Sequence, residues 1–194
     1  MLKSMMAGMI LVGAALASPA MAAGNDKGFL GSNTLRLGAG IGQNYVESTY
    51  QGLPFDEHAT ALEVFAGYEF NRWVALEGGY LNGGDATQDF NNGAVRIESS
   101  GVYATALGSL PITDTFGVYG RVGVIKWDAE LRDTIDGEVF FKRKRDGQDP
   151  IFGIGLAATV EGALARLEYR YADLDFAESR IISFSIVWQL PLGR

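Results

Sequence analysis

Charged residues that could do chemistry recur at alternate positions within otherwise apolar segments of this chain. Each stands on the face opposite the large apolar side chains of its segment. These residues are Arg36, Glu63, Glu69, Glu77, Arg121, Arg166, Glu168 and Arg170. Charges removed from water are tolerated when they are paired and hydrogen-bonded. Four arginines and four glutamates on one face therefore predict an internal network of ion pairs.

A catalytic or metal centre is difficult to assemble from the other residue types. His58 is the one histidine, and no serine stands at a fixed local spacing from it, so a Ser–His nucleophile is not predicted. Without cysteine, the chain has no thiol chemistry, no disulfides and no cysteine-ligated metal. Five residues could offer oxygen ligands to calcium: Asp85, Asp89, Asn91, Asp173 and Asp175. Their spacing fits no calcium-binding loop, so we predict no enzyme, no cofactor and no bound metal.

The strongest local charge feature is the run Lys142-Arg143-Lys144-Arg145. In a loop outside a membrane, these cations would face the phosphates of lipopolysaccharide or a sulfated host surface. The alternative is an exposed strand extension whose charges only keep the segment soluble. The net charge of the whole chain is −7, which argues against a general nucleic-acid binder.

The N-terminus has the layout of a secretory signal peptide. Lys3 precedes an apolar run over 5–17, and Ala20 and Ala22 are the small residues before the expected cleavage site. The apolar run is short for a membrane span, which disfavours the alternative of an anchored N-terminal helix. We therefore expect residues 1–22 to be removed, and residues 23–194 to form a single domain.

The rest of the chain alternates between apolar and small or polar residues, which is the period of a β-strand. In the first such segment, for example, Leu35 and Leu37 alternate with Arg36 and Gly38. Eight segments show this pattern: 34–42, 62–70, 74–80, 101–110, 116–124, 151–160, 163–172 and 182–190. The predicted fold is all-β, an eight-stranded antiparallel up-and-down transmembrane β-barrel.

The connections between these segments alternate in length. Short turns follow the second, fourth and sixth segments, and longer polar segments, predicted to be loops, follow the first, third, fifth and seventh. Lys126 and Trp127 are expected to mark the outer end of the fifth strand. Short turns at one end and long loops at the other are typical of outer-membrane barrels, whose turns face the periplasm.

Alternation alone also fits a soluble barrel with an apolar interior, so other features must decide between the two. The less apolar face is rich in glycine and alanine and has no lysine at a strand centre, which suits the crowded lumen of an eight-stranded barrel. A polar side chain in that lumen would need the room left by glycine on a neighbouring strand. Aromatic residues near strand ends on the apolar face predict girdles at the two membrane interfaces. They are Tyr68, Phe70, Tyr80, Tyr169, Tyr171 and Trp188.

Several sequence runs resemble a known family. They are GYEFNRWVALEGGY at 67–80, LPITD at 110–114, YGRVG at 119–123 and ARLEY at 165–169. In this order they resemble the transmembrane domain of the OmpA-like outer-membrane proteins. The resemblance implies that Glu77, Arg121, Arg166 and Glu168 belong to an interior network that plugs the lumen.

The sequence also departs from that family. Leu107 and Ala157 stand where the best-known members place a lysine and a glutamate that exchange partners to open the plug. Gating by that exchange is therefore not expected. No periplasmic peptidoglycan-binding domain is expected after 191–194 either, so tethering to the cell wall is not predicted.

From these features we predict a non-enzymatic outer-membrane protein of a Gram-negative bacterium that displays surface loops and supports envelope integrity or contact with lipids and cells. A narrow pore for ions or small solutes is the first alternative, and a lipid A-modifying enzyme is the second. The expected partners are outer-membrane lipids and lipopolysaccharide, the barrel-assembly machinery during insertion, and a host or cell-surface ligand.

Overall fold

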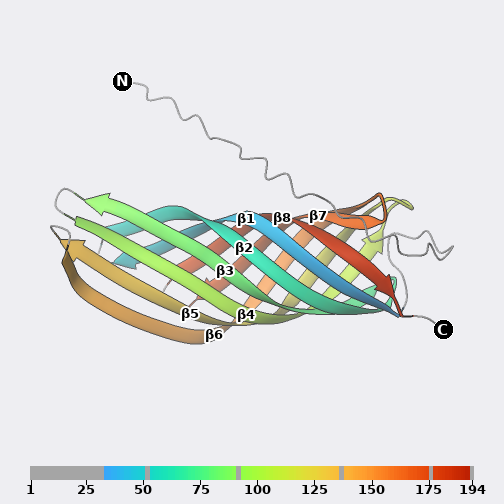
Figure 1. Ribbon diagram of the computed structural model, residues 1–194, viewed down its shortest axis with the longest axis horizontal. Coiled ribbons are helices and arrows are strands. Elements are labelled where there is room, and N and C mark those ends of the chain that lie inside the picture. The colour runs from blue at the N-terminus through green and yellow to red at the C-terminus, as the bar shows by residue number, and fades with distance from the viewer. Residues whose placement is uncertain (1–32, 51–52, 91–92, 136–137, 175–176, 193–194) are drawn as a thin grey trace, which may run out of the picture.

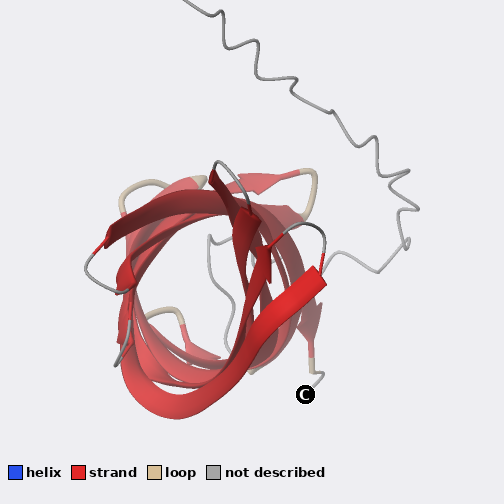
Figure 2. Cartoon of the chain, turned by 90° about the vertical axis from the view of Figure 1, so that its left-hand side faces the viewer, coloured by secondary structure: helices blue, strands red, loops and turns tan. Residues whose placement is uncertain are grey.

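The computed structural model describes residues 33–50, 53–90, 93–135, 138–174 and 177–192. The predicted signal peptide, residues 1–22, lies outside this part. Eight antiparallel strands form a closed barrel in sequence order, and β8 pairs with β1 to complete the ring (Figures 1 and 2). The strands are β1 (Thr34–Tyr50), β2 (Leu53–Asn71), β3 (Val74–Phe90), β4 (Gly93–Pro111), β5 (Phe116–Ile135), β6 (Glu138–Val160), β7 (Ala163–Leu174) and β8 (Ala177–Pro191). The predicted fold class is confirmed.

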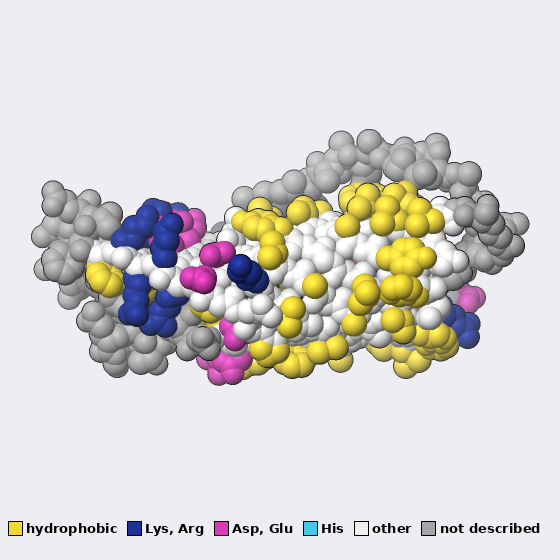
Figure 3. All heavy atoms as spheres, turned by 90° about the horizontal axis from the view of Figure 1, so that it is seen from below, with side chains coloured by type: hydrophobic (Ala, Val, Ile, Leu, Met, Phe, Trp, Pro, Cys, Tyr) yellow, Lys and Arg dark blue, Asp and Glu magenta, His cyan; other side chains and the backbone are white. Residues whose placement is uncertain are grey.

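The alternation within the strands divides the barrel wall into an outer and an inner surface. Large apolar side chains such as Val64, Leu76 and Leu156 face outward and are at least half exposed. They form an apolar belt around one part of the barrel (Figure 3). A soluble protein would not leave so continuous an apolar surface in water, so this belt is the membrane-spanning part. The described chain contains no helix that is long and apolar enough to cross a membrane.

The polar segments predicted as long loops are instead strand, and this prediction was wrong. β1 continues to Tyr50, β2 begins at Leu53, and β5 and β6 pair as far out as Ile135 and Glu138. At this end the β1–β2, β3–β4 and β5–β6 hairpins rise beyond the apolar belt, on the left of Figure 1. Lys126 and Trp127 do not end the fifth strand, which continues to Ile135, and Trp127 is buried inside the barrel.

The reason for this error is a change of polarity along the barrel axis. Within the belt, apolar residues face outward and charged residues face inward. In the outer extension, apolar side chains fill the interior and charged side chains cover the outside. The inner cluster of the extension is Val46, Ala59, Ala86, Val95, Ile97 and Ala177, with Leu131 packed against it. The alternation of inward and outward residues continues past the boundary, with a register shift on β3 between Asn82 and Gly84, but the two faces exchange roles.

Candidate functional site

Glu77 on β3 is the centre of the charge network inside the belt. Its side chain is fully buried and lies against three arginines that reach it from three other strands. Arg166 Nη1 donates to Glu77 Oε1 at 2.8 Å and to Oε2 at 3.1 Å. Arg121 Nη2 donates to Oε2 at 3.2 Å, and Arg36 Nη1 lies 3.4 Å from Oε1. One carboxylate therefore joins β1, β5 and β7 across the lumen.

A second layer of charges lies beside the first, and Arg121 links the two. Arg121 Nη2 is 2.9 Å from Glu168 Oε2, and Arg170 Nε donates to Glu168 Oε1 at 2.7 Å. Arg170 Nη2 also donates to Glu63 Oε2 at 2.9 Å. The structure thus brings seven of the eight predicted charges into one network that crosses the barrel.

Glu69 is the predicted member of the network that makes no ion pair with another described residue. Its Oε2 accepts a long hydrogen bond of 3.4 Å from Gln189, and its Oε1 has no partner. Nitrogens on Arg36, Arg121, Arg166 and Arg170 also lack a protein acceptor. Buried polar groups of this kind are commonly satisfied by ordered water, so the network is the natural place for hydration inside the lumen.

Aromatic residues on the inner face complete the network, although the sequence argument gave them no role. The Tyr119 hydroxyl donates to Glu168 at 2.6 Å, and the Tyr103 hydroxyl donates to Glu63 at 3.1 Å. The Arg166 guanidinium lies 4.5 Å from the centre of the Phe65 ring, close enough for a cation–π contact. These rings stand at the same alternate positions of their strands as the charges do. The alternation in the sequence therefore indicates that they face the lumen.

Glycine on the adjacent strand makes room for each of these rings. Gly155 is the direct cross-strand partner of Tyr119, and a Cβ atom on it would lie 2.5 Å from the tyrosine Cζ. Gly38 stands opposite Phe65 in the same way, where a Cβ would overlap the ring. The lumen is therefore packed by pairing a large side chain with glycine.

Comparison with known proteins identifies the family. The family model described as "OmpA-like transmembrane domain" matches residues 31–179. The chain belongs to this family. It is 31% identical over 147 residues to outer membrane protein A of Salmonella typhi. This match covers 73% of this chain and 41% of the Salmonella protein. The corresponding Shigella flexneri protein is also 31% identical, over 73% of this chain and 42% of its own length. The chain therefore spans about two fifths of the length of these relatives.

Solved structures show the same fold at low sequence identity. Ail, the attachment invasion locus protein of Yersinia pestis, solved in complex with the heparin analogue sucrose octasulfate, has a TM-score of 0.57 and 17% identity. The match covers 82% of this chain and 99% of Ail. The N-terminal β-barrel domain of Pseudomonas aeruginosa OprF has a TM-score of 0.55 and 13% identity, with 82% and 99% coverage. Membership of the OmpA-like family makes this barrel an integral outer-membrane protein with transmembrane strands.

In this OmpA-like barrel the two departures from the family pattern lie in the packed interior. Leu107 and Ala157 are each 2% exposed and belong to the main apolar cluster. Leu107 stands opposite Arg121 on β5, and Ala157 stands opposite Arg166 on β7. Neither side chain can form an ion pair with Glu77 or Arg166. These two positions therefore provide no alternative charged partners for the network.

The run Lys142-Arg143-Lys144-Arg145 does not lie in a loop, as predicted, but in the outer part of β6. A strand is favoured because every residue of the run pairs with β5. The run is therefore divided between two faces. Lys142 and Lys144 face outward, at 2.8 and 3.6 Å from the Glu130 carboxylate on β5. Arg143 and Arg145 occupy the alternate register positions, opposite Leu131 and Ala129, and are exposed as well.

These lysines end a ladder of ion pairs on the outside of the extension. The ladder crosses β3 to β6 in the order Asp85, Arg96, Glu98, Arg132, Glu130 and Lys142, with nitrogen–oxygen distances of 2.5–3.6 Å. In Figure 3, blue and magenta side chains gather beyond the yellow belt. Cross-strand pairs of opposite charge stabilise a sheet. Residues 142–145 therefore form a strand extension, which was the alternative to the anion-binding loop predicted from the sequence.

The other chemical candidates are not assembled into a site. His58 is exposed on β2 and lies beside Tyr45, with ring centres 6.2 Å apart. Asp85 is paired with Arg96, while Asn91 and Asp175 lie outside the described residues. Within the part that the structure describes, no three residues of the types His, Cys, Asp or Glu are placed to hold a metal ion.

Glu130 gives this ladder a defined pH dependence. Hydrogen bonds from Lys142, the larger cause, and from Arg132 lower the pKa of its carboxyl from 4.5 to about 2. Because the folded-state pKa is depressed, its stabilising effect is complete above pH 4.5 and disappears as the pH falls towards 2. We expect NMR of the Glu130 side-chain carboxyl to show a midpoint near 2. Lys142→Gln should raise the midpoint towards 4.5, whereas Lys126→Gln should not, and equal midpoints in both variants would contradict this assignment.

Proposed function

We propose that this protein is a non-enzymatic outer-membrane barrel whose closed lumen makes it a rigid element of the envelope, and that it displays a strand-built extension outside the membrane. The observation that carries the proposal is the two-layer charge network. Its side chains come from five strands, and all eight predicted charges are at most 5% exposed. In an eight-stranded barrel, side chains can fill the interior completely. We also propose that residues 1–22 direct export and are removed, and that the barrel-assembly machinery inserts the mature chain.

A narrow pore is the second candidate, and the unpartnered guanidinium nitrogens favour it because they can bind water along the lumen. Against it, Arg166 and Arg121 are both held on Glu77, and Leu107 and Ala157 offer them no other acceptor. Opening a path would therefore separate buried ion pairs without replacing them, which costs several kcal/mol.

Single-channel recording from protein refolded into a planar bilayer tests this function. We expect a silent membrane from the wild type, with insertion shown by the heat-dependent shift of the folded barrel on a gel. The variant Glu77→Gln/Arg166→Gln removes the central pair without adding net charge, and it should conduct if removing that pair opens the lumen. Steady steps from the wild type, altered by the variant, would instead establish the protein as a narrow pore.

We propose lipopolysaccharide as the main partner of the outer band, because exposed cations beyond the apolar belt would face its phosphates. A sulfated host saccharide is the other anionic candidate, and the likeness of fold to Ail, solved with a heparin analogue, supports testing it. All four clustered cations are exposed, and two of them, Lys142 and Lys144, are held by Glu130.

The expected affinity for anions is therefore weak in the wild type and stronger when Glu130 is neutral. Glu130→Gln should raise the salt concentration needed to elute the folded barrel from a heparin column. Glu47→Gln, which neutralises an outward carboxylate on β1 that pairs with Arg180 on β8, is the matched control. Equal elution of the wild type and both variants would exclude Lys142 and Lys144 as an anion site.

A further inference from the structure

The outer part of β6 is a sheet edge that has a neighbouring strand on one side only. β6 pairs with β5 along most of its length, but with β7 only from Ile151 to Val160. β7 itself ends at Leu174, and β8 begins at Ala177. Within the described chain, residues 138–150 therefore have a strand partner on the β5 side alone. On the left of Figure 1, this part of β6 lies at the lower margin of the extension.

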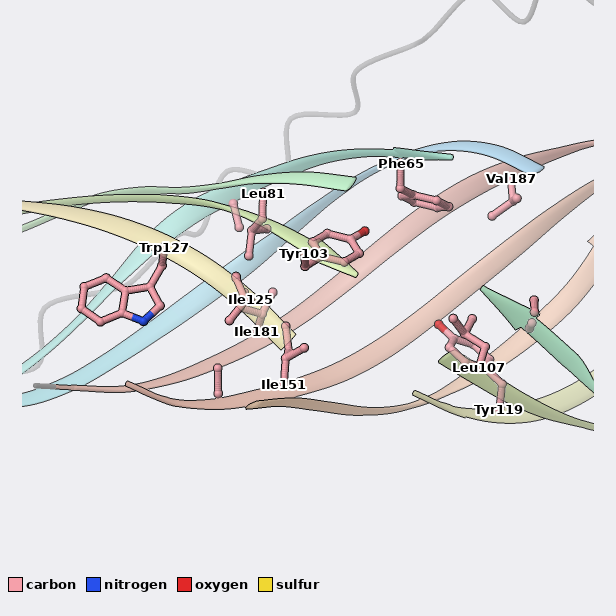
Figure 4. Packing of buried hydrophobic residues seen from close by; sticks show 14 of the residues in the cluster. Phe65, Leu81, Tyr103, Leu107, Tyr119, Ile125, Trp127, Ile151, Ile181 and Val187 are labelled. Carbon is pink, nitrogen blue, oxygen red and sulfur yellow. The ribbon is translucent and has the colours of Figure 1, made fainter. Parts of the chain in front are cut away.

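Two residues mark the point where this free edge begins. Ile151, the outermost β6 residue that pairs with β7, is buried in the main apolar cluster together with Ile125 and Ile181 (Figure 4). Pro150 comes directly before it and is exposed. Proline has no N–H to donate to a neighbouring strand, and in sheets it is found mainly at edges and bulges. Beyond Pro150, the main-chain groups that point away from β5 have no strand partner among the described residues.

The middle of this free edge carries the basic run Lys142-Arg143-Lys144-Arg145, and all four side chains are exposed. Successive side chains of a strand point to opposite faces of the sheet, so each face of the edge has two cations. On one face, Lys142 and Lys144 are paired with Glu130. On the other, Arg143 makes no ion pair with another described residue. The edge can therefore attract anionic groups on both of its faces.

We propose that the free edge of β6, over residues 141–149, binds an extended acidic segment of another polypeptide, which joins the sheet as an additional strand. The unpaired edge of a sheet is a template for such an addition. The main chain of the segment would pair with the free N–H and C=O groups of β6, and its carboxylates would lie beside the four cations as cross-strand neighbours. This inference goes beyond the structural role proposed for the barrel, because it does not depend on the state of the lumen.

The chemistry of the edge favours a polypeptide over other anionic partners. A strand edge presents hydrogen-bond donors and acceptors in alternation, and a peptide main chain supplies both. Fully ionised phosphate and sulfate groups accept hydrogen bonds but do not donate them, so they would leave the free C=O groups of β6 unpaired. A second copy of this chain would bring its own basic run to the edge, and like charges directly opposite each other in a sheet are destabilising.

Hydrogen exchange, measured by NMR on the folded barrel in detergent micelles, tests the added strand. The probe is a synthetic peptide in which a run of glutamates is flanked by threonine and valine. We expect it to slow exchange at alternate backbone amides within residues 141–149, because every second N–H of β6 points away from β5. A second peptide has the same number of glutamates, each followed by proline, so it keeps the charge but cannot extend a sheet. It should bind more weakly and leave these amides unprotected.

Two double substitutions locate the binding site. Arg143→Gln/Arg145→Gln removes the cations from one face of the edge. It should weaken binding of the first peptide about tenfold, the effect expected from losing two cross-strand ion pairs. Arg96→Gln/Arg180→Gln removes the same charge from β4 and β8 and should leave binding nearly unchanged. Both variants should remain folded on a gel.

Four results would overturn the proposal. Equal binding of the two peptides, or binding that protects none of these amides, would show charge attraction without an added strand. Equal weakening by the two double substitutions would place the peptide elsewhere on the extension. Equal protection of the amides by heparin would assign the edge to a saccharide. Protection that rises with protein concentration in the absence of peptide would assign it to a second copy of the chain.

Discussion

Replacing Glu77 with glutamine is expected to destabilise the barrel by about 3–5 kcal/mol, the usual cost of removing one partner from a buried ion pair. The side chain keeps its shape, but Arg36, Arg121 and Arg166 lose the carboxylate that they share. Since whole domains are stable by only about 5–15 kcal/mol, the midpoint of urea unfolding in lipid vesicles should fall sharply.

The chain supplies a matched control for this substitution. Glu130 also has three cationic partners, Arg132, Lys142 and Lys144, but it lies on the outside of the extension. Exposed ion pairs are screened by water and contribute less than buried ones, so Glu130→Gln should lower the midpoint much less than Glu77→Gln does. If Glu77→Gln fails to refold, Glu77→Asp, which keeps the charge, should refold. Similar midpoints for Glu77→Gln and Glu130→Gln would contradict the central role of Glu77.

Adding one methyl group at Gly123 should also be costly. A Cβ atom there would overlap the Ala104 carbonyl oxygen and lie 2.6 Å from Thr105 Cα, both on the β4 backbone. A backbone cannot turn aside as a side chain can, so Gly123→Ala should cost about 1–3 kcal/mol, the range for overpacked interiors. Unfolding by urea, followed by tryptophan fluorescence, would measure this change.

Gly120, three positions earlier on β5, is the control for that substitution. A Cβ there would face outward and meet nothing nearer than the Gly153 carbonyl oxygen at 3.8 Å. Gly120→Ala should therefore leave stability equal or slightly higher, because alanine loses less backbone entropy than glycine on folding. A Gly123→Ala variant as stable as Gly120→Ala would show that the β4 and β5 backbones can separate without cost.

The membrane-spanning part of this fold could be predicted from the sequence because its two-residue period is carried by strong contrasts. Leu37 and Ile41 face lipid, while Arg36 faces the lumen, and such contrasts specify both the strand and its register. The charged members of the site followed from the same alternation. Glycine among them indicated a crowded interior, which the cross-strand pair of Gly155 and Tyr119 confirms.

The partners within the site could not be predicted in the same way. Alternation places Glu69 and Glu77 on the same face of the wall. Their partners depend on the curvature of the wall and on the cross-strand register. These bring three arginines to Glu77 and leave Glu69 beside Gln189. Tyr103 and Tyr119 were visible on the inner face, but their hydrogen bonds to Glu63 and Glu168 cross the lumen. Contacts of this kind depend on closure of the ring, which no local spacing encodes.

The outer extension was misjudged for a different reason. Charged residues such as Glu130 and Arg132 alternate there with Leu131, so the segment has the period of a strand but the composition of a loop. Its interior is built from small clusters such as Val95 and Ile97 rather than from long apolar runs. The composition of this segment indicates a loop and its period indicates a strand, and the period is the better guide to its structure.

The exchange of polarity between belt and extension also fixes how deeply the barrel is immersed. Moving it outward by two residues would carry Val102 and Val124 into water, and moving it inward would carry Lys126 and Asp128 into hydrocarbon. Both displacements are unfavourable, whereas a barrel with a gradual transition could slide to match bilayers of different thickness. This protein should therefore deform the surrounding lipid rather than shift its own height when membrane thickness changes.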